Sequence, residues 1–150
     1  ALCLTRQKLP FLQAEPENIA QAAKGAWTIV PANNPKAIIF ATGSEVHLAI
    51  SVANRLSEHY KIPTQVVSVP CWELFFAQPL EYQQSILKWD CPVRISIEAG
   101  ATLGWSEFVG PKGMTIGLDQ FGASAPADKL EEDFGFTPDA ILTKVMGHFF

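Results

Sequence analysis

The chain has 150 residues, of which 48% are hydrophobic and 17% are charged, and its formal net charge at pH 7 is -4. This length and composition allow one buried core, which excludes general disorder and favours a single main domain. The negative charge and the lack of a Lys or Arg run argue against nucleic-acid and membrane partners, and no apolar run is long enough to span a bilayer.

Three widely spaced cysteines, Cys3, Cys71 and Cys91, fit neither a disulfide framework nor a zinc site. A reducing compartment is therefore the default expectation. Cys71 is interpreted as a structural thiol in preference to a reactive one. The sequence starts at Ala1 without a signal-peptide pattern, and we expect it to be a piece cut from a longer chain.

The first residues are expected to precede the main domain. A short apolar run at 1–5 leads through Arg6 to Leu9-Pro10, as if the last strand of an earlier domain were leaving its sheet. Residues 11–18 contain a proline and two acidic residues without periodicity, and they are interpreted as an exposed linker.

Two strands and a helix are predicted next. Residues 25–30 have strand composition, and the turn-rich stretch at 31–35 is short enough to join two neighbouring strands. Residues 36–41 form a buried strand that turns directly into an amphipathic helix, because apolar residues recur at helical spacing over 46–56. Ser44 is the expected N-cap of this helix.

Further strands are predicted at 64–69, 93–97 and 114–118, with short helical segments around 74–76 and over 81–88. After the last strand, Ser124 is the expected N-cap of a helix with Pro126 in its first turn. This helix should end at Gly135 in a left-handed conformation. A final helix follows Pro138, and its apolar side should pack on the sheet through Ile141, Leu142, Val145, Met146 and Phe149.

The predicted elements add up to an α/β fold, a three-layer sandwich with a five-stranded mixed sheet. Four strands alternate with helices, which implies parallel pairing through right-handed crossovers. The strand at 25–30 is expected to be antiparallel at one edge. In such a sheet the ligand-facing crevice lies at the carboxyl ends of the strands, which directs attention to the loops at 98–100 and 121–126.

No complete catalytic motif is present. The Thr-Gly-Ser turn at 42–44 has one glycine where the dinucleotide fingerprint needs three. His47 is a candidate crevice contact, although a polar residue completing a helix start is the favoured interpretation. Glu98 is a candidate general base, but without a visible partner a role in accepting loop amides is favoured. Aromatic residues are interpreted as core or interface filling: Trp72, Phe75, Phe76, Trp105 and Phe108.

Six segments, taken in order and spacing, resemble the C-terminal third of transketolase. They are LTRQKLP at 4–10, ATGSEVHLA at 41–49, VVSVPCWELF at 66–75, RISIEAG at 94–100, GW at 104–105 and GLDQFGASAP at 117–126. The resemblance covers the chain apart from its last residues, where KVMGHFF at 144–150 replaces the basic, alanine-rich tail of the family.

The resemblance implies a transferase that moves a two-carbon ketol unit between sugar phosphates in the pentose phosphate and Calvin pathways. Family members form homodimers and hold thiamine diphosphate with Mg or Ca between the first two domains of opposite subunits. This chain lacks the family's Gly-Asp-Gly motif, its cofactor-activating glutamate and its catalytic histidines. We therefore expect it to hold no cofactor or metal and to be inactive alone, as a structural and dimer-supporting module.

One functional residue of the family carries over. Arg6 matches the arginine that grips the substrate phosphate, a role that suits a guanidinium fork. The resemblance also makes 1–18 the end of the preceding, pyrimidine-binding domain with its linker, and 19–150 the C-terminal domain. The expected setting is cytoplasmic, or a plastid for a photosynthetic source.

Two alternatives stay open. The crevice at the strand ends, with Ser44, His47, Glu98 and Ser124 as contacts, suggests a regulatory anion- or nucleotide-binding module. The equivalent domain of a related thiamine diphosphate enzyme would share the fold, although Arg6 and the segment 121–126 favour transketolase.

Overall fold

A five-stranded mixed sheet forms the centre of the computed structural model, which describes Thr5, residues 7–12 and residues 20–150. The strands are β1 (Trp27–Val30), β2 (Ala37–Ala41), β3 (Thr64–Ser68), β4 (Val93–Ile97) and β5 (Met114–Ile116). Their order is β1-β3-β2-β4-β5; β1 is antiparallel to β3, and the other pairs are parallel. The predicted mixed sheet with one antiparallel edge strand is confirmed. The predicted strand at 1–5 lies outside the described residues except for Thr5.

The prediction that the turn at 31–35 joins two neighbouring strands is wrong. β2 is flanked on both sides by parallel partners, β3 and β4, so it has no free edge for β1. β1 pairs instead with the outer edge of β3. The connection passes the start of β3, where the Lys36 amide donates to the carbonyl of Pro63 at 2.8 Å.

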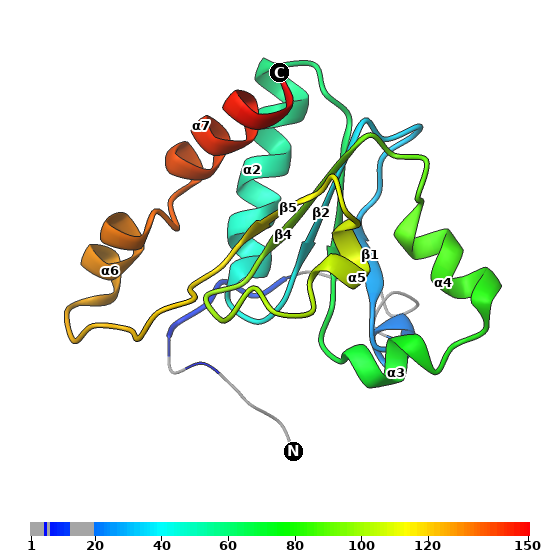
Figure 1. Cartoon of the computed structure of the whole chain (residues 1–150), viewed down its shortest axis with the longest axis horizontal. Coiled ribbons are helices and arrows are strands. Elements are labelled where there is room, and N and C mark those ends of the chain that lie inside the picture. Colours follow the sequence, from blue (N-terminus) through cyan, green and yellow to red (C-terminus); the bar gives the residue numbers. More distant parts are fainter. Residues whose placement is uncertain (1–4, 6, 13–19) are drawn as a thin grey trace.

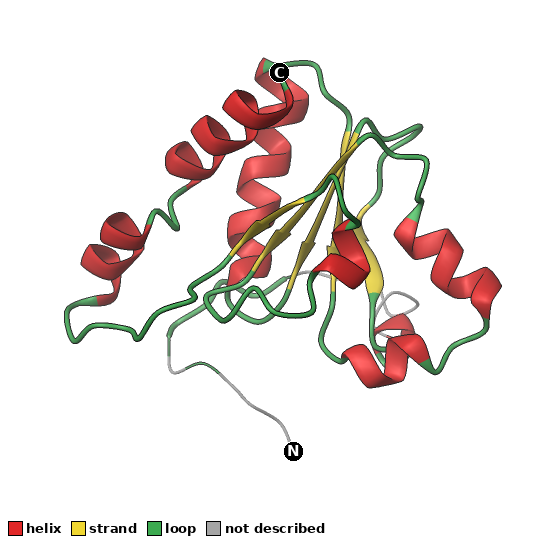
Figure 2. Ribbon diagram, in the orientation of Figure 1, coloured by secondary structure: helices red, strands yellow, loops and turns green. Residues whose placement is uncertain are grey.

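Helices cover both faces of the sheet and complete the predicted three layers (Figures 1 and 2). One face carries α2 (Glu45–His59) and α7 (Pro138–Phe149), and the other carries α3 (Trp72–Phe76), α4 (Leu80–Leu87) and α5 (Ser106–Val109). Helix α6 (Ala127–Phe134) stands to the side of the sheet below α7 in Figure 1. None of the described helices is long and apolar enough to cross a membrane.

The two faces of the sheet have separate hydrophobic cores. Toward α2 and α7, alternate residues of β2 and β4, such as Ile39 and Ile95, pack against Leu56 and Ile141. On the opposite face the core is aromatic, and it contains Phe40, Phe75, Trp105 and Phe108. Every residue of β2 is buried, as expected for a central strand covered on both sides. The predicted core role of Phe75, Trp105 and Phe108 is confirmed.

Two of the predicted helix caps need correction. Ser44 occupies the N-cap position of α2, but its backbone is already helical and its hydroxyl donates to Glu45 Oε1 at 2.8 Å instead of capping an amide. The N-cap of α6 is Pro126, so Ser124 lies outside that helix. Gly135 does end α6 in the left-handed region, with φ 74°. The cap that forms through a side chain is Thr137, whose hydroxyl accepts from the Ala140 amide at 3.3 Å.

Arg94 is a charged residue on the aromatic side of β4, and it is only 5% exposed. Its guanidinium donates to the carbonyls of Leu87 and Lys88 at the end of α4, and to those of Phe108 and Val109 at the end of α5. Helix carboxyl ends carry unpaired carbonyls and partial negative charge, so one cation satisfies two helix ends. Burial lowers the pKa of Arg94, but a guanidinium still remains protonated at neutral pH.

We expect the substitution Arg94→Met to lower the free energy of unfolding by about 3 kcal/mol or more, because several buried carbonyls lose their donor. Urea unfolding followed by circular dichroism measures this loss. Arg55→Met is the matched control, because Arg55 pairs with Asp139 on the surface and such pairs contribute about 0–1 kcal/mol. Equal losses in the two variants would contradict the assigned role of Arg94.

Candidate functional site

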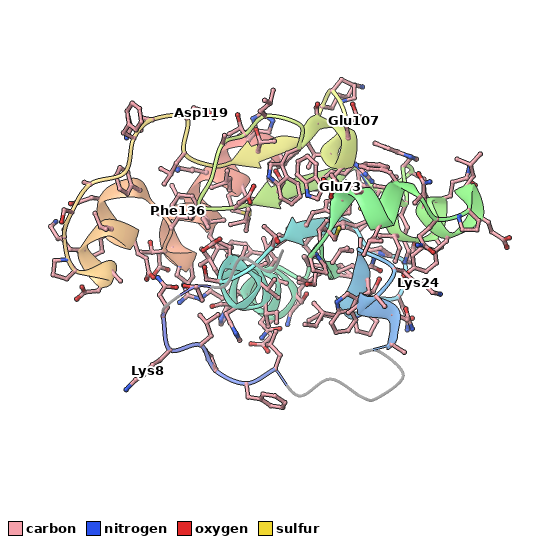
Figure 3. All side chains as sticks on the ribbon, turned by 90° about the horizontal axis from the view of Figure 1, so that it is seen from below. Lys8, Lys24, Glu73, Glu107, Asp119 and Phe136 are labelled. Atoms are coloured by element: carbon pink, nitrogen blue, oxygen red, sulfur yellow. The ribbon has the colours of Figure 1, made fainter. Side chains whose placement is uncertain are left out.

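The loops that follow β2, β4 and β5 meet at the carboxyl edge of the sheet, which Figure 3 views from below. Their polar groups bind one another. The Ala99 amide donates to Glu45 Oε2 at 3.2 Å, and the Leu118 amide donates to the Gly100 carbonyl at 2.7 Å. Backbone donors that would otherwise be free for a ligand are therefore used to join the three loops.

A clamp between Thr102 and Asp119 reinforces this junction. The Thr102 amide donates to Asp119 Oδ1 and the Thr102 hydroxyl donates to Asp119 Oδ2, each at 2.8 Å. Both bonds favour the ionised carboxylate, with the amide the larger cause, and they lower the pKa of Asp119 below its ordinary value of 3.8. Figure 3 shows Asp119 on the segment that leads from β5 to α6.

Gly117 allows the close approach that the clamp needs. A Cβ atom at this position would lie 2.7 Å from the Gly100 carbonyl oxygen and 2.8 Å from Thr102 Cγ2. Both neighbours belong to the loop after β4, so a side chain at Gly117 would push the two loops apart.

The four predicted crevice residues do not converge. Ser44 and His47 line one cleft of about 300 Å³ at the start of α2, together with Glu45 and Glu131. A second cleft, described below, lies beside the first. Glu98 and Ser124 line neither of the two clefts, and Ser124 is exposed.

Glu98 has a different partner from the predicted loop amides. Its Oε2 accepts a hydrogen bond from the indole Nε1 of Trp105 at 2.7 Å. Glu45 is the carboxylate that accepts a loop amide, that of Ala99. Glu98 thus anchors Trp105, which is buried in the aromatic core.

A second cleft, of about 230 Å³, lies beside the first and was not found by sequence reasoning. Most of its lining is apolar: Ala99, Leu118, Ala123, Ala127, Leu130, Phe134 and Phe136. Gln7, Glu45 and Glu131 line both clefts. The spacing of Leu130 and Phe134 on one side of a helix was the available signal, but sequence reasoning assigned no role to that side.

Neither of these two clefts fits a diphosphate group. Both carry the carboxylates of Glu45 and Glu131, which repel anions, and no described Lys or Arg lines either cleft. In the described part of the chain, no three His, Cys, Asp and Glu side chains gather as metal ligands would. Arg6, the predicted phosphate contact, lies outside the described residues.

The family model of the transketolase-like TK C-terminal domain matches residues 25–137. The chain belongs to the transketolase family. Its transketolase relatives include the chloroplastic enzyme of Solanum tuberosum, 46% identical over 94% of this chain, and that of Geobacillus stearothermophilus, 42% identical over 96%. The chain spans only 19% and 22% of the length of these two proteins.

The transketolase fold is also found in solved structures. A transketolase from Pichia stipitis, crystallised with sedoheptulose-7-phosphate, superimposes with a TM-score of 0.82 at 36% identity. The superposition covers 96% of this chain and 20% of the Pichia protein. The alternative of an anion- or nucleotide-binding module is not favoured, because the match is to the transketolase C-terminal domain and the predicted contacts are dispersed.

We expect Gly117→Ala to destabilise the domain by about 1–3 kcal/mol, the usual cost of overpacking a close contact. Gly122→Ala in the same loop is the control: a Cβ atom there meets nothing within 4 Å, and the expected change stays within about 0.5 kcal/mol. The urea concentrations at the unfolding midpoints of the two variants, each compared with that of the unmodified chain, measure these changes in stability. Similar midpoints would show that the loops after β4 and β5 are not tightly joined.

The Thr102–Asp119 clamp should depend on pH. Because the pKa of Asp119 is lowered on folding, the clamp stabilises the fold above the ordinary carboxyl pKa and loses this effect as pH falls through the lowered value. An NMR titration of the Thr102 amide shift should therefore give a midpoint below 3.8. In Asp119→Asn the midpoint should disappear, whereas a midpoint above 3.8 in the unmodified chain would contradict the clamp.

Proposed function

We propose that this chain is the structural, dimer-supporting domain of a longer transketolase that transfers a two-carbon ketol unit between sugar phosphates. The observation that carries the proposal is the combination of internal hydrogen bonds and exposed apolar side chains at the carboxyl edge of the sheet. Amides of its loops donate to acceptors of the same edge, whereas Leu103 and Phe121 in these loops are 87% and 100% exposed. Exposed apolar side chains of this kind suit contacts with protein better than contacts with a phosphorylated ligand.

The cofactor belongs elsewhere in the proposed parent enzyme. Thiamine diphosphate and its Mg or Ca ion, which supply the carbanion chemistry of the transfer, are assigned to the parts outside this chain. Residues 1–18 are assigned to the end of the preceding pyrimidine-binding domain and its linker. Within them, Arg6 is the residue of this chain that we assign to the substrate phosphate, through its planar donor fork.

The proposed setting is the cytoplasm, or the plastid of a photosynthetic source. The relatives support both, because the potato protein is named as chloroplastic and another relative is bacterial. The proposed assembly is a homodimer of the parent enzyme, with pentose phosphate and Calvin-pathway sugar phosphates as substrates.

Light scattering coupled to size exclusion tests the dimer-supporting role. Over a tenfold range of concentration, the chain should show a mass near twice its 16.4 kDa. A mass of one chain at every concentration would contradict dimer support. A ketol-transfer assay on the same sample, with added thiamine diphosphate and Mg, should show no turnover; activity of the chain alone would overturn the assignment of catalysis to the missing parts.

A further inference from the structure

The helix α6 has an apolar side that the described part of the chain covers only in part, since Phe134 packs against the core but both it and Leu130 stay half-buried. None of its residues is buried, although Leu130 and Phe134 are one turn apart on the same side. With Leu118, Ala123 and Phe136 they form the apolar wall of the second cleft, which we call the α6 groove. A helix with this pattern normally packs its apolar side against other protein.

We propose that the α6 groove is the seat of the polypeptide that precedes this chain in the parent enzyme. The inference rests on the proposed function, because it requires a longer protein. It goes further by naming one surface of the domain and one occupant for it.

The path of the N-terminal arm, residues 7–12, supports this occupant. Gln7 lines the α6 groove and the neighbouring cleft, Leu9 lines the neighbouring cleft, and Leu12 packs against the core on the α2 face. Figure 3 shows Lys8 on this arm pointing outward, away from the domain. The arm thus lies at the mouth of the groove.

The amount of missing protein is sufficient to fill the groove. The matched family is a C-terminal domain, and the chain spans about a fifth of its relatives. Most of the parent enzyme would therefore precede this chain. A long preceding segment that is tethered at the groove has a high effective concentration there, so it needs little affinity of its own to bind.

The groove also indicates the chemistry of its occupant. Phe121, fully exposed, comes directly before Gly122 and Ala123, which line the groove. The lining of the groove is acidic, because it contains the carboxylates of Glu45 and Glu131 and no described Lys or Arg. The lysine of α6, Lys129, pairs with Asp133 at 2.6 Å. The complementary surface is apolar with basic residues around it.

Thiol labelling of two matched variants tests the proposal. Phe121→Cys places a thiol beside the groove, and Leu80→Cys places one on α4, where Leu80 is 73% exposed. Each variant is made in the 150-residue chain and in the parent enzyme, and maleimide labelling is followed by peptide mass spectrometry, which separates it from labelling of the native cysteines.

We expect labelling of Phe121→Cys to be about tenfold slower, or more, in the parent enzyme than in the short chain, as for a site shielded by packing. Labelling of Leu80→Cys should proceed at the same rate in both. Equal rates for Phe121→Cys in the two proteins would overturn the proposal.

Two other outcomes would assign the groove to a different occupant. Protection in the parent enzyme that disappears when its dimer is diluted to monomers would assign the groove to the partner subunit. Protection that is already present in the short chain and rises with its concentration would assign it to a second copy of this domain. Either result overturns the proposal, whereas a monomeric mass in light scattering contradicts dimer support and leaves the labelling ratio intact.

Discussion

The aromatic layer of this domain depends on the buried guanidinium of Arg94. Four carbonyls from the ends of α4 and α5 converge on it, and the rings of Trp89 and Phe40 lie 4.3 Å and 5.4 Å from its central carbon. Neither helix is long enough to be stable alone. Their docking relies on one side chain of the central sheet, which explains how short segments form a complete layer over β4.

Local periodicity was sufficient to predict most of the fold. The buried strand at 37–41 and the helix after it could be found because a continuous apolar run and helical spacing are local properties. The partner of β1 could not be found in this way, since pairing with β3 depends on which edges the later strands occupy. The role of Arg94 was also missed, although its acceptors end the helices directly before and after β4. Local periodicity does not show that the ends of these two helices meet at one side chain of the sheet.

The candidate site shows where sequence reasoning ends. The predicted strand topology correctly placed the loops after β2, β4 and β5 at one edge of the sheet, as the hydrogen bond between the Ala99 amide and Glu45 demonstrates. It could not tell that Glu98 turns toward Trp105, because side-chain direction at a strand end is set by packing. Family resemblance, by contrast, depends on many positions at once, so it identified the domain although no single motif carries chemistry.

The ties between the two loops divide the segment after β5 into two parts. Gly117, Leu118 and Asp119 are fixed against the loop after β4, whereas 120–126 are all exposed. Insertions or deletions within 120–126 would therefore change the reach and angle of α6 without altering the register of the sheet. During evolution, changes in the length of this segment would reorient α6 to fit a neighbouring protein surface of different shape, while the rest of the domain stays the same.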